Sequence, residues 1–364
     1  MNSTKRAYNF NAGPSALPIE VIQKAQEELV NYNHSGMSIM EMSHRSKDYE
    51  AVHNDAIARL KSLYSIPDNY EVLFLQGGGS LQFTMVPMNF LNSDQTASYI
   101  LTGSWSEKAF KEAKLFGQIR EAASTKDNDY RNIPALEEIQ FSQTDSYVHI
   151  TSNNTIYGTQ WKDFPQTGGV PLVADMSSDI LSKPVDVSNF GIIYAGAQKN
   201  LGPSGVTVVI IRKDLLEKAN TNIPTLLKYS THAEANSLYN TPPTFGIYML
   251  GEVLKWVEEK GGLEAIESNN EEKAKLIYDV IDCSNGFYYG HAHSESRSLM
   301  NITFRVSDEN LEKQFLAEAR EAGFIGLNGH RSVGGCRAST YNAVPYETCK
   351  ALADFMVAFQ NKNS

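Results

Sequence analysis

The sequence has little of what would indicate a disulfide-bonded, membrane-bound or nucleic-acid-binding protein. Among its 364 residues are only three cysteines, Cys283, Cys336 and Cys349, and no CxxC pair, so neither a disulfide framework nor a zinc site is predicted. The amino terminus has no apolar signal-peptide segment, and the apolar run 206–211 is too short to cross a bilayer. The formal charge of -10 argues against a broad nucleic-acid-binding face. We expect a cytoplasmic protein without metal, membrane or nucleic-acid partners.

The two common nucleotide-binding glycine motifs, GxGxxG and GxxxxGK[ST], are also missing. A different glycine run, Gly77-Gly78-Gly79-Ser80, follows the apolar segment 71–76 and precedes a helix-like pattern. Glycines let backbone N–H groups approach an anion, and the start of a helix adds positive potential. Taken alone, such a run is as often a simple turn.

What the sequence does contain is a regular alternation of strand-like and helix-like segments. The predicted strands are 71–76, 97–103, 146–153, 170–175, 190–197 and 206–211. Strands that alternate with helices indicate an α/β fold with a mostly parallel sheet covered on both faces. The last two strands are joined by only about nine residues, which is too short for a helical crossover, so strand 206–211 is expected to be antiparallel to strand 190–197.

The length of the chain and a change in the pattern of helix-like and strand-like segments near residue 262 predict two domains. Domains commonly contain roughly 100–200 residues, and 364 residues accommodate two. We expect a large domain at 13–262 and a smaller α/β domain at 263–364, with residues 1–12 packing on the small one.

Polar or aromatic residues follow the predicted strands, at the edge where parallel sheets bind ligands. Trp105 follows strand 97–103, Thr155 follows strand 146–153, Asp175 ends strand 170–175, and Lys199 lies between the last two strands. Each has an ordinary structural explanation when considered alone. The tryptophan could be core, the threonine part of a turn, the aspartate a cap, and the lysine a solvated loop residue.

Together these residues match the needs of pyridoxal 5'-phosphate. Its phosphate binds at a helix N-terminus, its ring stacks on a flat side chain, its pyridine nitrogen stays protonated beside a carboxylate, and its aldehyde forms a Schiff base with a lysine. The glycine run, Trp105, Asp175 and Lys199 would supply these groups. Partial burial would lower the pKa of Lys199, so that its amine could attack and transfer protons.

Nine motifs in order resemble the phosphoserine aminotransferase family, a class-V group of fold-type-I pyridoxal-phosphate enzymes. They are YNFNAGPSALP, GMSIMEMSHRS, LFLQGGGSLQF, LTGSWSEKA, NNTIYG, VADMSSDILS, YAGAQKNLGPSG, YNTPPTF and GHRSVGGCRASTYNA, and they extend from residue 8 to residue 343. The resemblance implies a large domain built on a mostly parallel seven-stranded sheet, a smaller C-terminal α/β domain, and a homodimer with shared active sites.

The resemblance also implies a role for each matching residue. Lys199 would be the Schiff-base lysine, Asp175 would pair with the pyridine nitrogen, and Trp105 would stack on the ring. The other cofactor-binding residues would be Gly79, Ser80, Thr155 and Gln198, with Asn240 and Thr241 reaching the phosphate from the neighbouring subunit. The substrate-binding residues would be Arg337 for the α-carboxylate and His44, Arg45, His330 and Arg331 for the substrate's phosphate or side-chain carboxylate, partly across the dimer.

Two departures from the family pattern affect the phosphate contacts. Some members have an arginine at the position of Ser80, so a cationic contribution is missing here. Asn11 and Ala12 stand where some relatives have serines. The compact basic groups SHRS and GHRSVGGCR nevertheless suit a substrate that carries both a carboxylate and a phosphate.

The implied reaction is a transamination from L-glutamate to the phosphorylated 2-oxo acid 3-phosphohydroxypyruvate, giving O-phosphoserine and 2-oxoglutarate in serine biosynthesis. The family also accepts a related four-carbon substrate of pyridoxine synthesis. Two alternatives are another class-V enzyme, such as a serine–glyoxylate type aminotransferase or a cysteine desulfurase, and a non-catalytic phosphate-binding module. The desulfurase would need a reactive loop cysteine and a histidine at the position of Trp105.

Overall fold

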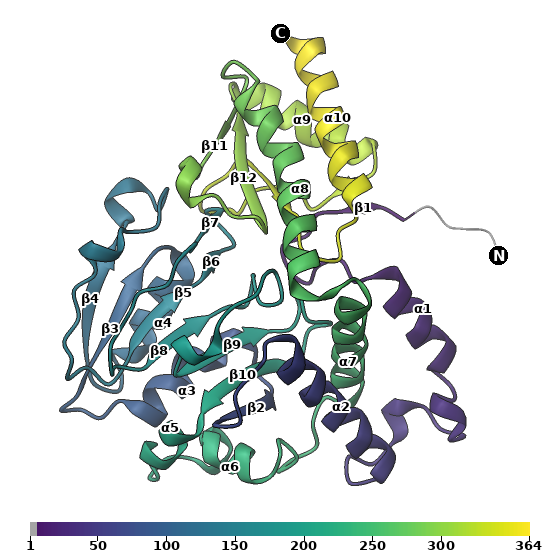
Figure 1. The fold of residues 1–364 in the computed structure, drawn as a ribbon. Coiled ribbons are helices and arrows are strands. Elements are labelled where there is room, and N and C mark those ends of the chain that lie inside the picture. The colour runs from purple at the N-terminus through teal and green to yellow at the C-terminus, as the bar shows by residue number, and fades with distance from the viewer. Residues whose placement is uncertain (1–5) are drawn as a thin grey trace.

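The chain is built around a twisted seven-stranded sheet with helices on both faces and a smaller three-stranded sheet above it (Figure 1). The computed structural model describes residues 6–364. The described strands are β1 (Tyr8–Asn9), β2 (Tyr70–Leu75), β3 (Thr96–Leu101), β4 (Gln118–Ser124), β5 (Val148–Thr151), β6 (Asn153–Asn154), β7 (Thr159–Gln160), β8 (Leu172–Asp175), β9 (Ile192–Gly196), β10 (Thr207–Arg212), β11 (Tyr288–Gly290), β12 (Asn301–Val306), β13 (Phe324–Ile325) and β14 (Cys336–Ser339). The described α-helices are α1 (Ile19–Glu28), α2 (Lys47–Leu63), α3 (Gly78–Phe90), α4 (Ser104–Ala113), α5 (Lys213–Lys218), α6 (Tyr229–Glu234), α7 (Thr244–Glu259), α8 (Gly262–Asp282), α9 (Glu309–Glu321) and α10 (Tyr346–Asn363).

The large sheet has the order β2-β10-β9-β8-β5-β3-β4, and every pair that does not involve β10 is parallel. β10 is antiparallel to both of its neighbours, β9 and β2. The prediction of a mostly parallel sheet with an antiparallel strand at 206–211 is therefore confirmed. The short connection from β9 to β10 carries Lys199.

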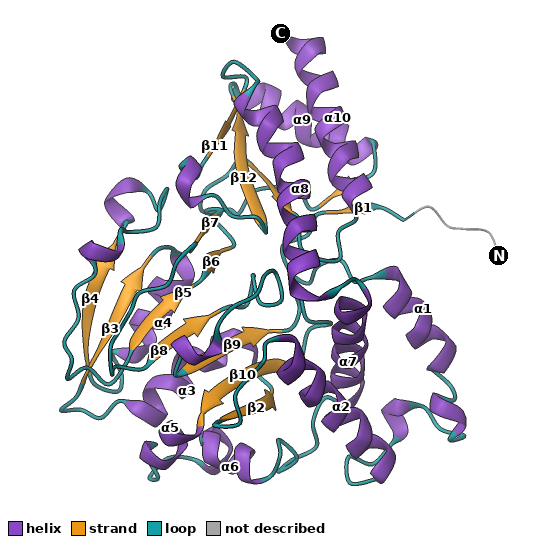
Figure 2. Cartoon of the chain, viewed as in Figure 1, coloured by secondary structure: helices purple, strands orange, loops and turns teal. Residues whose placement is uncertain are grey.

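Alternate residues of each central strand pack on opposite faces of the large sheet. In β2, Val72 and Phe74 join the core that includes α2 and α7, whereas Leu73 and Leu75 join the core that includes α3 and α4. This period of two within an apolar segment is what a strand buried on both faces requires. Figure 2 shows the helices (purple) on both sides of the strands (orange).

The C-terminal part contains the antiparallel sheet β11-β12-β14 and the helices α8, α9 and α10, with an apolar core of its own. β1 pairs in parallel with β13, which fixes the described part of the 1–12 segment on this unit, and residues 1–5 lie outside the described residues. The α7–α8 junction falls at 259–262. We propose that the domains divide there. None of the helices within 6–364 combines the length and apolarity that crossing a membrane would need.

Two elements differ from the sequence prediction. β4 was not predicted, because it is an edge strand of the sequence QIREAAS in which only Ala122 is fully buried, so it lacks an apolar pattern. The strand expected at 146–153 is shorter, since Asn153–Asn154 leave the sheet to form the β6–β7 hairpin. Thr155 lies in the turn of that hairpin and lines the cavity described next.

Candidate active site

A cavity of about 290 Å³ lies at the carboxyl ends of the parallel strands. It collects residues that are distant in sequence, from Ala12 to Arg337 of β14. The predicted site residues that line it are Gly79, Ser80, Trp105, Thr155, Asp175, Gln198, Lys199, His330 and Arg337. Their convergence satisfies the geometric requirement for a single binding site.

Lys199 is partly buried on the cavity wall. Its Nζ donates to Thr155 Oγ1 at 2.7 Å, and its backbone carbonyl accepts from Ser15 Oγ at 2.5 Å. Burial lowers the pKa of Lys199 to about 8, an effect that the negative charge of Asp175 opposes and the cation of Arg337 reinforces. Near neutral pH a useful fraction of this amine is therefore neutral and nucleophilic.

Asp175 ends β8 with only 6% of its surface exposed. Its Oδ1 accepts the backbone N–H of Ser177 at 2.9 Å, which fixes the carboxylate at the cavity. Burial raises the pKa of Asp175, while bonds from Ser177 and the charge of Lys199 oppose the shift. A buried carboxylate in this position favours a cationic partner, and the protonated nitrogen of a pyridine ring would be one.

The glycine run forms the first turn of α3 after β2. Gly77 is the N-cap at φ +90°, a left-handed conformation that favours glycine. A Cβ on Gly79 would come within 3.0 Å of Ser177 Oγ, so the backbone there approaches the segment that follows Asp175 unusually closely. Gly79 and Ser80 line the cavity, and the N–H groups of a helix start, which have no partner within the helix, suit an anion.

Three buried polar atoms of residues that line the cavity have no hydrogen-bond partner within residues 6–364: Trp105 Nε1, Thr151 Oγ1 and Arg337 Nε. Arg337 extends from β14 and donates Nη1–H to the carbonyl of Thr155 at 3.1 Å. Burial lowers the pKa of Arg337, as expected for a cation held out of water. Together with the helix start, Asp175 and Lys199, these donors fit pyridoxal phosphate and a carboxylate-bearing substrate.

His330 lines the cavity, and its Nδ1 lies 2.7 Å from Ser332 Oγ. Burial and the cations of Arg337 and Arg331 lower its pKa. The neutral imidazole can then both donate and accept a hydrogen bond.

The five other predicted residues lie outside the cavity: His44, Arg45, Asn240, Thr241 and Arg331. His44 and Arg45 precede α2, and Asn240 and Thr241 precede α7. The carbonyl of Thr241 accepts from Gln76 Nε2 at 3.2 Å, just before the glycine run. A single chain thus does not bring these five residues to the cavity wall.

Sequence reasoning missed Ser177, which lines the cavity and positions Asp175 by donating its backbone N–H to Asp175 Oδ1. Its hydroxyl accepts the N–H of Gly196 at 3.1 Å, linking the segment after β8 to the end of β9. Its position two residues after the predicted ring-binding aspartate was the signal that could have identified it. Among the described residues no cysteine lines the cavity, which removes the group that a cysteine desulfurase would need.

Comparison with known proteins identifies the family. The family model described as aminotransferase class-V matches residues 7–352. The phosphoserine aminotransferase of Lysinibacillus sphaericus (strain C3-41) is 78% identical over 360 residues, which cover 99% of both chains. The chain belongs to the phosphoserine aminotransferase branch of the class-V aminotransferases.

Solved structures of phosphoserine aminotransferases have the same fold. That of the Bacillus circulans subsp. alkalophilus protein matches with a TM-score of 0.98 at 60% identity and covers 99% of this chain and 100% of the other. The structure from Trichomonas vaginalis, described as bound to PLP, matches with a TM-score of 0.91 at 39% identity and covers 97% and 100%. The predicted family, aminotransferase activity and cofactor are therefore confirmed for this phosphoserine aminotransferase branch.

Proposed function

We propose that the protein transfers the amino group of L-glutamate to 3-phosphohydroxypyruvate, giving O-phospho-L-serine and 2-oxoglutarate, in the serine biosynthesis of the cytoplasm. One observation carries the proposal: Lys199, Asp175, the α3 helix start and Arg337 share one cavity. A bound pyridoxal phosphate would supply an electron sink for the pair released when a proton leaves the substrate Cα. The family's second reaction, on a phosphorylated substrate of pyridoxine synthesis, would use the same groups.

Each of the cavity residues would have a separate role in binding the cofactor or in proton transfer. Asp175 would hold the proton on the ring nitrogen, and Trp105 would pack against the ring. The helix start at Gly79 and Ser80 would bind the phosphate, together with Thr155 and Gln198. The neutral amine of Lys199 would attach the cofactor at rest, and during the reaction it would move a proton from the substrate Cα to the C4′ carbon of the cofactor.

Arg337 would orient the substrate by holding its α-carboxylate. Its guanidinium already donates to Thr155, which also accepts from Lys199. Thr155 thus contacts both the arginine that would hold the substrate carboxylate and the reacting amine. The Cα–H bond of the substrate would therefore point toward Lys199 in a defined direction.

The predicted site residues that lie outside the cavity of one chain include Asn240, Thr241, His44 and Arg45. A homodimer would complete the site, because a second copy would bring such residues to the cavity. Exposed apolar side chains surround the segment before His44: Leu29, Val30, Met37 and Met40 are exposed by 40%, 81%, 42% and 54%. Such a patch is typical of a surface that another chain covers. We propose that a second copy covers it.

Met40→Asp is therefore expected to weaken the dimer at least about tenfold and to lower activity in parallel, because an unpaired charge would be buried. Analytical ultracentrifugation over a dilution series measures the association, and an amino-transfer assay at the same concentrations measures activity. Leu115→Asp, at another exposed apolar residue (76%) outside the patch, is the control. A fully active monomer would contradict the assignment of Asn240 and Thr241.

The substrate phosphate should decide which 2-oxo acid is used. The chain carries a formal charge of -10, so a trianionic substrate must be attracted locally by Arg45, His330 and Arg331. Charge-assisted bonds to a phosphate contribute roughly 1.5–3 kcal/mol each. Two of them would give kcat/KM on the order of 10²–10⁴ higher for 3-phosphohydroxypyruvate than for hydroxypyruvate.

Arg331→Ala should reduce kcat/KM for the phosphorylated acceptor far more than for hydroxypyruvate, with glutamate as donor in both assays. Because Ser80 supplies no cation, the remaining basic residues cannot replace the lost arginine. Arg320→Ala, an exposed arginine on α9 outside the cavity, should change neither value. Equal losses on both acceptors would favour a serine–glyoxylate type aminotransferase instead.

A further inference from the structure

Lys273 of α8 is a fully buried lysine (0% exposed) that the proposed mechanism does not use. Its ammonium is surrounded by backbone carbonyls of the loop that joins β14 to α10. The distances from Nζ are 2.9 Å to the carbonyl oxygen of Tyr341, 3.1 Å to those of Thr340 and Val344, and 3.5 Å to that of Asn342. An ammonium has three N–H donors, so the three shorter contacts use all of them.

No carboxylate is among these contacts, which distinguishes Lys273 from an ordinary ion pair. The other titratable group near it is the buried thiol of Cys349. Burial raises the pKa of Cys349 to about 12, so this thiol is neutral near pH 7. Burying an ammonium without an anion is costly unless polar groups replace its water. Here the carbonyl oxygens do so, as they do for cations bound by proteins.

The loop of residues 340–344 connects the two sides of the cavity. Tyr341 donates its O–H to the carbonyl of Ala12, which lines the cavity, at 2.8 Å. The backbone N–H of Asn342 donates to Asn200 Oδ1 at 3.0 Å, and Asn200 directly follows Lys199. Thr340 is three residues after Arg337.

α8 holds the same loop at a second point. Asn270 lies three residues before Lys273 and donates its amide N–H to Asn342 Oδ1 at 2.9 Å and to the carbonyl of Ser182 at 3.1 Å. Residues three apart lie on one face of a helix, so Asn270 and Lys273 act on the loop together. Lys199 and Arg337 are linked through Asn200, its hydrogen bond to Asn342, and the loop that leads back to Arg337. This face of α8 therefore supports the link between the two residues.

We propose that the Lys273 ammonium is a built-in cation: it fills a cation site made by the carbonyls of loop 340–344 and so positions Arg337 relative to Lys199. Lys273 is then a positioning residue, since it touches neither substrate nor cofactor. The positioning role rests on the proposed function, whereas the cation site itself can be tested by stability alone.

The test uses the dimeric holoenzyme and the Lys273→Ala variant, which lacks the ammonium and most of the side chain. Because the unpaired carbonyls would let loop 340–344 shift, and Arg337 with it, KM for glutamate should rise about tenfold, which corresponds to about 1.4 kcal/mol of lost binding. The rise in KM should exceed any fall in kcat, because Arg337 is displaced while Lys199 keeps its chemistry. The melting temperature should fall as well.

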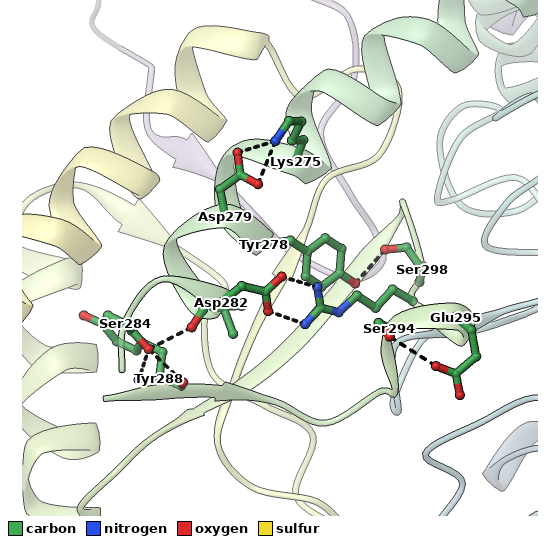
Figure 3. Close-up of polar contacts among 11 residues, drawn as sticks. Lys275, Tyr278, Asp279, Asp282, Ser284, Tyr288, Ser294, Glu295 and Ser298 are labelled. Carbon is green, nitrogen blue, oxygen red and sulfur yellow. Dashed lines mark hydrogen bonds and ion pairs between the residues drawn. The ribbon is translucent and has the colours of Figure 1, made fainter. Parts of the chain in front are cut away.

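Ethylammonium chloride should reverse both changes in Lys273→Ala, because it replaces the lost charge and donors. Ethanol with an equal concentration of sodium chloride should not, although it has the same number of heavy atoms. Lys275→Ala is the matched control: Lys275 lies on the exposed side of α8 and pairs with Asp279 at 2.6 Å, as Figure 3 shows. Exposed pairs of this kind contribute little, so this variant should behave like the wild type.

Lys273→Met, which fills the space without a charge, keeps the test decisive if the alanine variant does not fold. A methionine variant with the wild-type KM and melting temperature would overturn the proposal, because packing alone would then suffice. Equal recovery by ethylammonium and ethanol would also overturn it. If the wild type lacked glutamate activity, the proposed function would fail, and the melting temperatures would still decide whether the cation site exists.

Discussion

Replacing Lys199 with alanine is expected to abolish nearly all amino transfer while the fold is retained. A positioned general acid–base contributes about 10²–10⁴-fold to a rate, and Lys199 would also provide the covalent attachment of the cofactor, so we expect a loss at the upper end of this range or beyond it. Single-turnover transfer from glutamate to 3-phosphohydroxypyruvate measures the loss. Reduction of the holoenzyme with borohydride, followed by peptide mapping, should place the cofactor on Lys199 in the wild type and remove the label in the variant.

Lys183→Ala is the control for this experiment. Lys183 lies in the segment after Asp175, but its Nζ contacts the carbonyls of Trp161 and Lys162 and it does not line the cavity. Activity and labelling should persist when it is replaced. A label on Lys183 or Lys228 in the wild type would refute the assignment of Lys199.

Asp175→Asn is expected to lower kcat about 10²–10³-fold while the cofactor still binds, a cost typical of losing one well-placed electrostatic group. An amide cannot keep the ring nitrogen protonated, but it can still accept the N–H of Ser177. The visible absorption of the bound cofactor reports occupancy, and stopped-flow kinetics with glutamate report the proton-transfer step.

Asp179 offers a matched control four residues further along the chain. It is also buried (7% exposed) and accepts from Ser152 Oγ and, at 3.2 Å, from Gln160 Nε2, but it does not line the cavity. Asp179→Asn should lower the melting temperature while reducing kcat far less than Asp175→Asn does. Similar kinetic losses in both variants would mean that burial of charge, rather than ring protonation, explains the effect.

The sequence predicted the central strands because they are buried on both faces, and continuous apolar segments between turns are visible without any partner. β10 was assigned correctly as antiparallel because chain length alone excludes a helical crossover. β4 was not predicted from the sequence, because an edge strand with one exposed face needs few apolar residues. β4 forms because it pairs with β3. The first residue of β3, Thr96, lies 22 residues before its partner Gln118 in β4.

The cavity residues were predicted largely from their place after strands, and nine of the fourteen residues proposed for the site line it. The other five, such as Arg45 and Asn240, were expected to act partly across a dimer, and in the single chain they do not line the cavity. Lys273 was not predicted at all. Within EEKAKLIYDVID it resembles any solvated lysine of an amphipathic helix, because its carbonyl partners lie about 70 residues away and carry no side-chain signal.

The antiparallel insertion of β10 also has a consequence for how the protein is made. β2 is an edge strand whose partner in the described sheet is β10, some 130 residues later in the chain. During synthesis from the amino terminus, the turn at Gly77 therefore cannot reach its final place until residue 212 has emerged from the ribosome. Arg337 is added later still. Cofactor capture must then follow the synthesis of β10 and β14, and a nascent chain arrested before β10 should not retain pyridoxal phosphate.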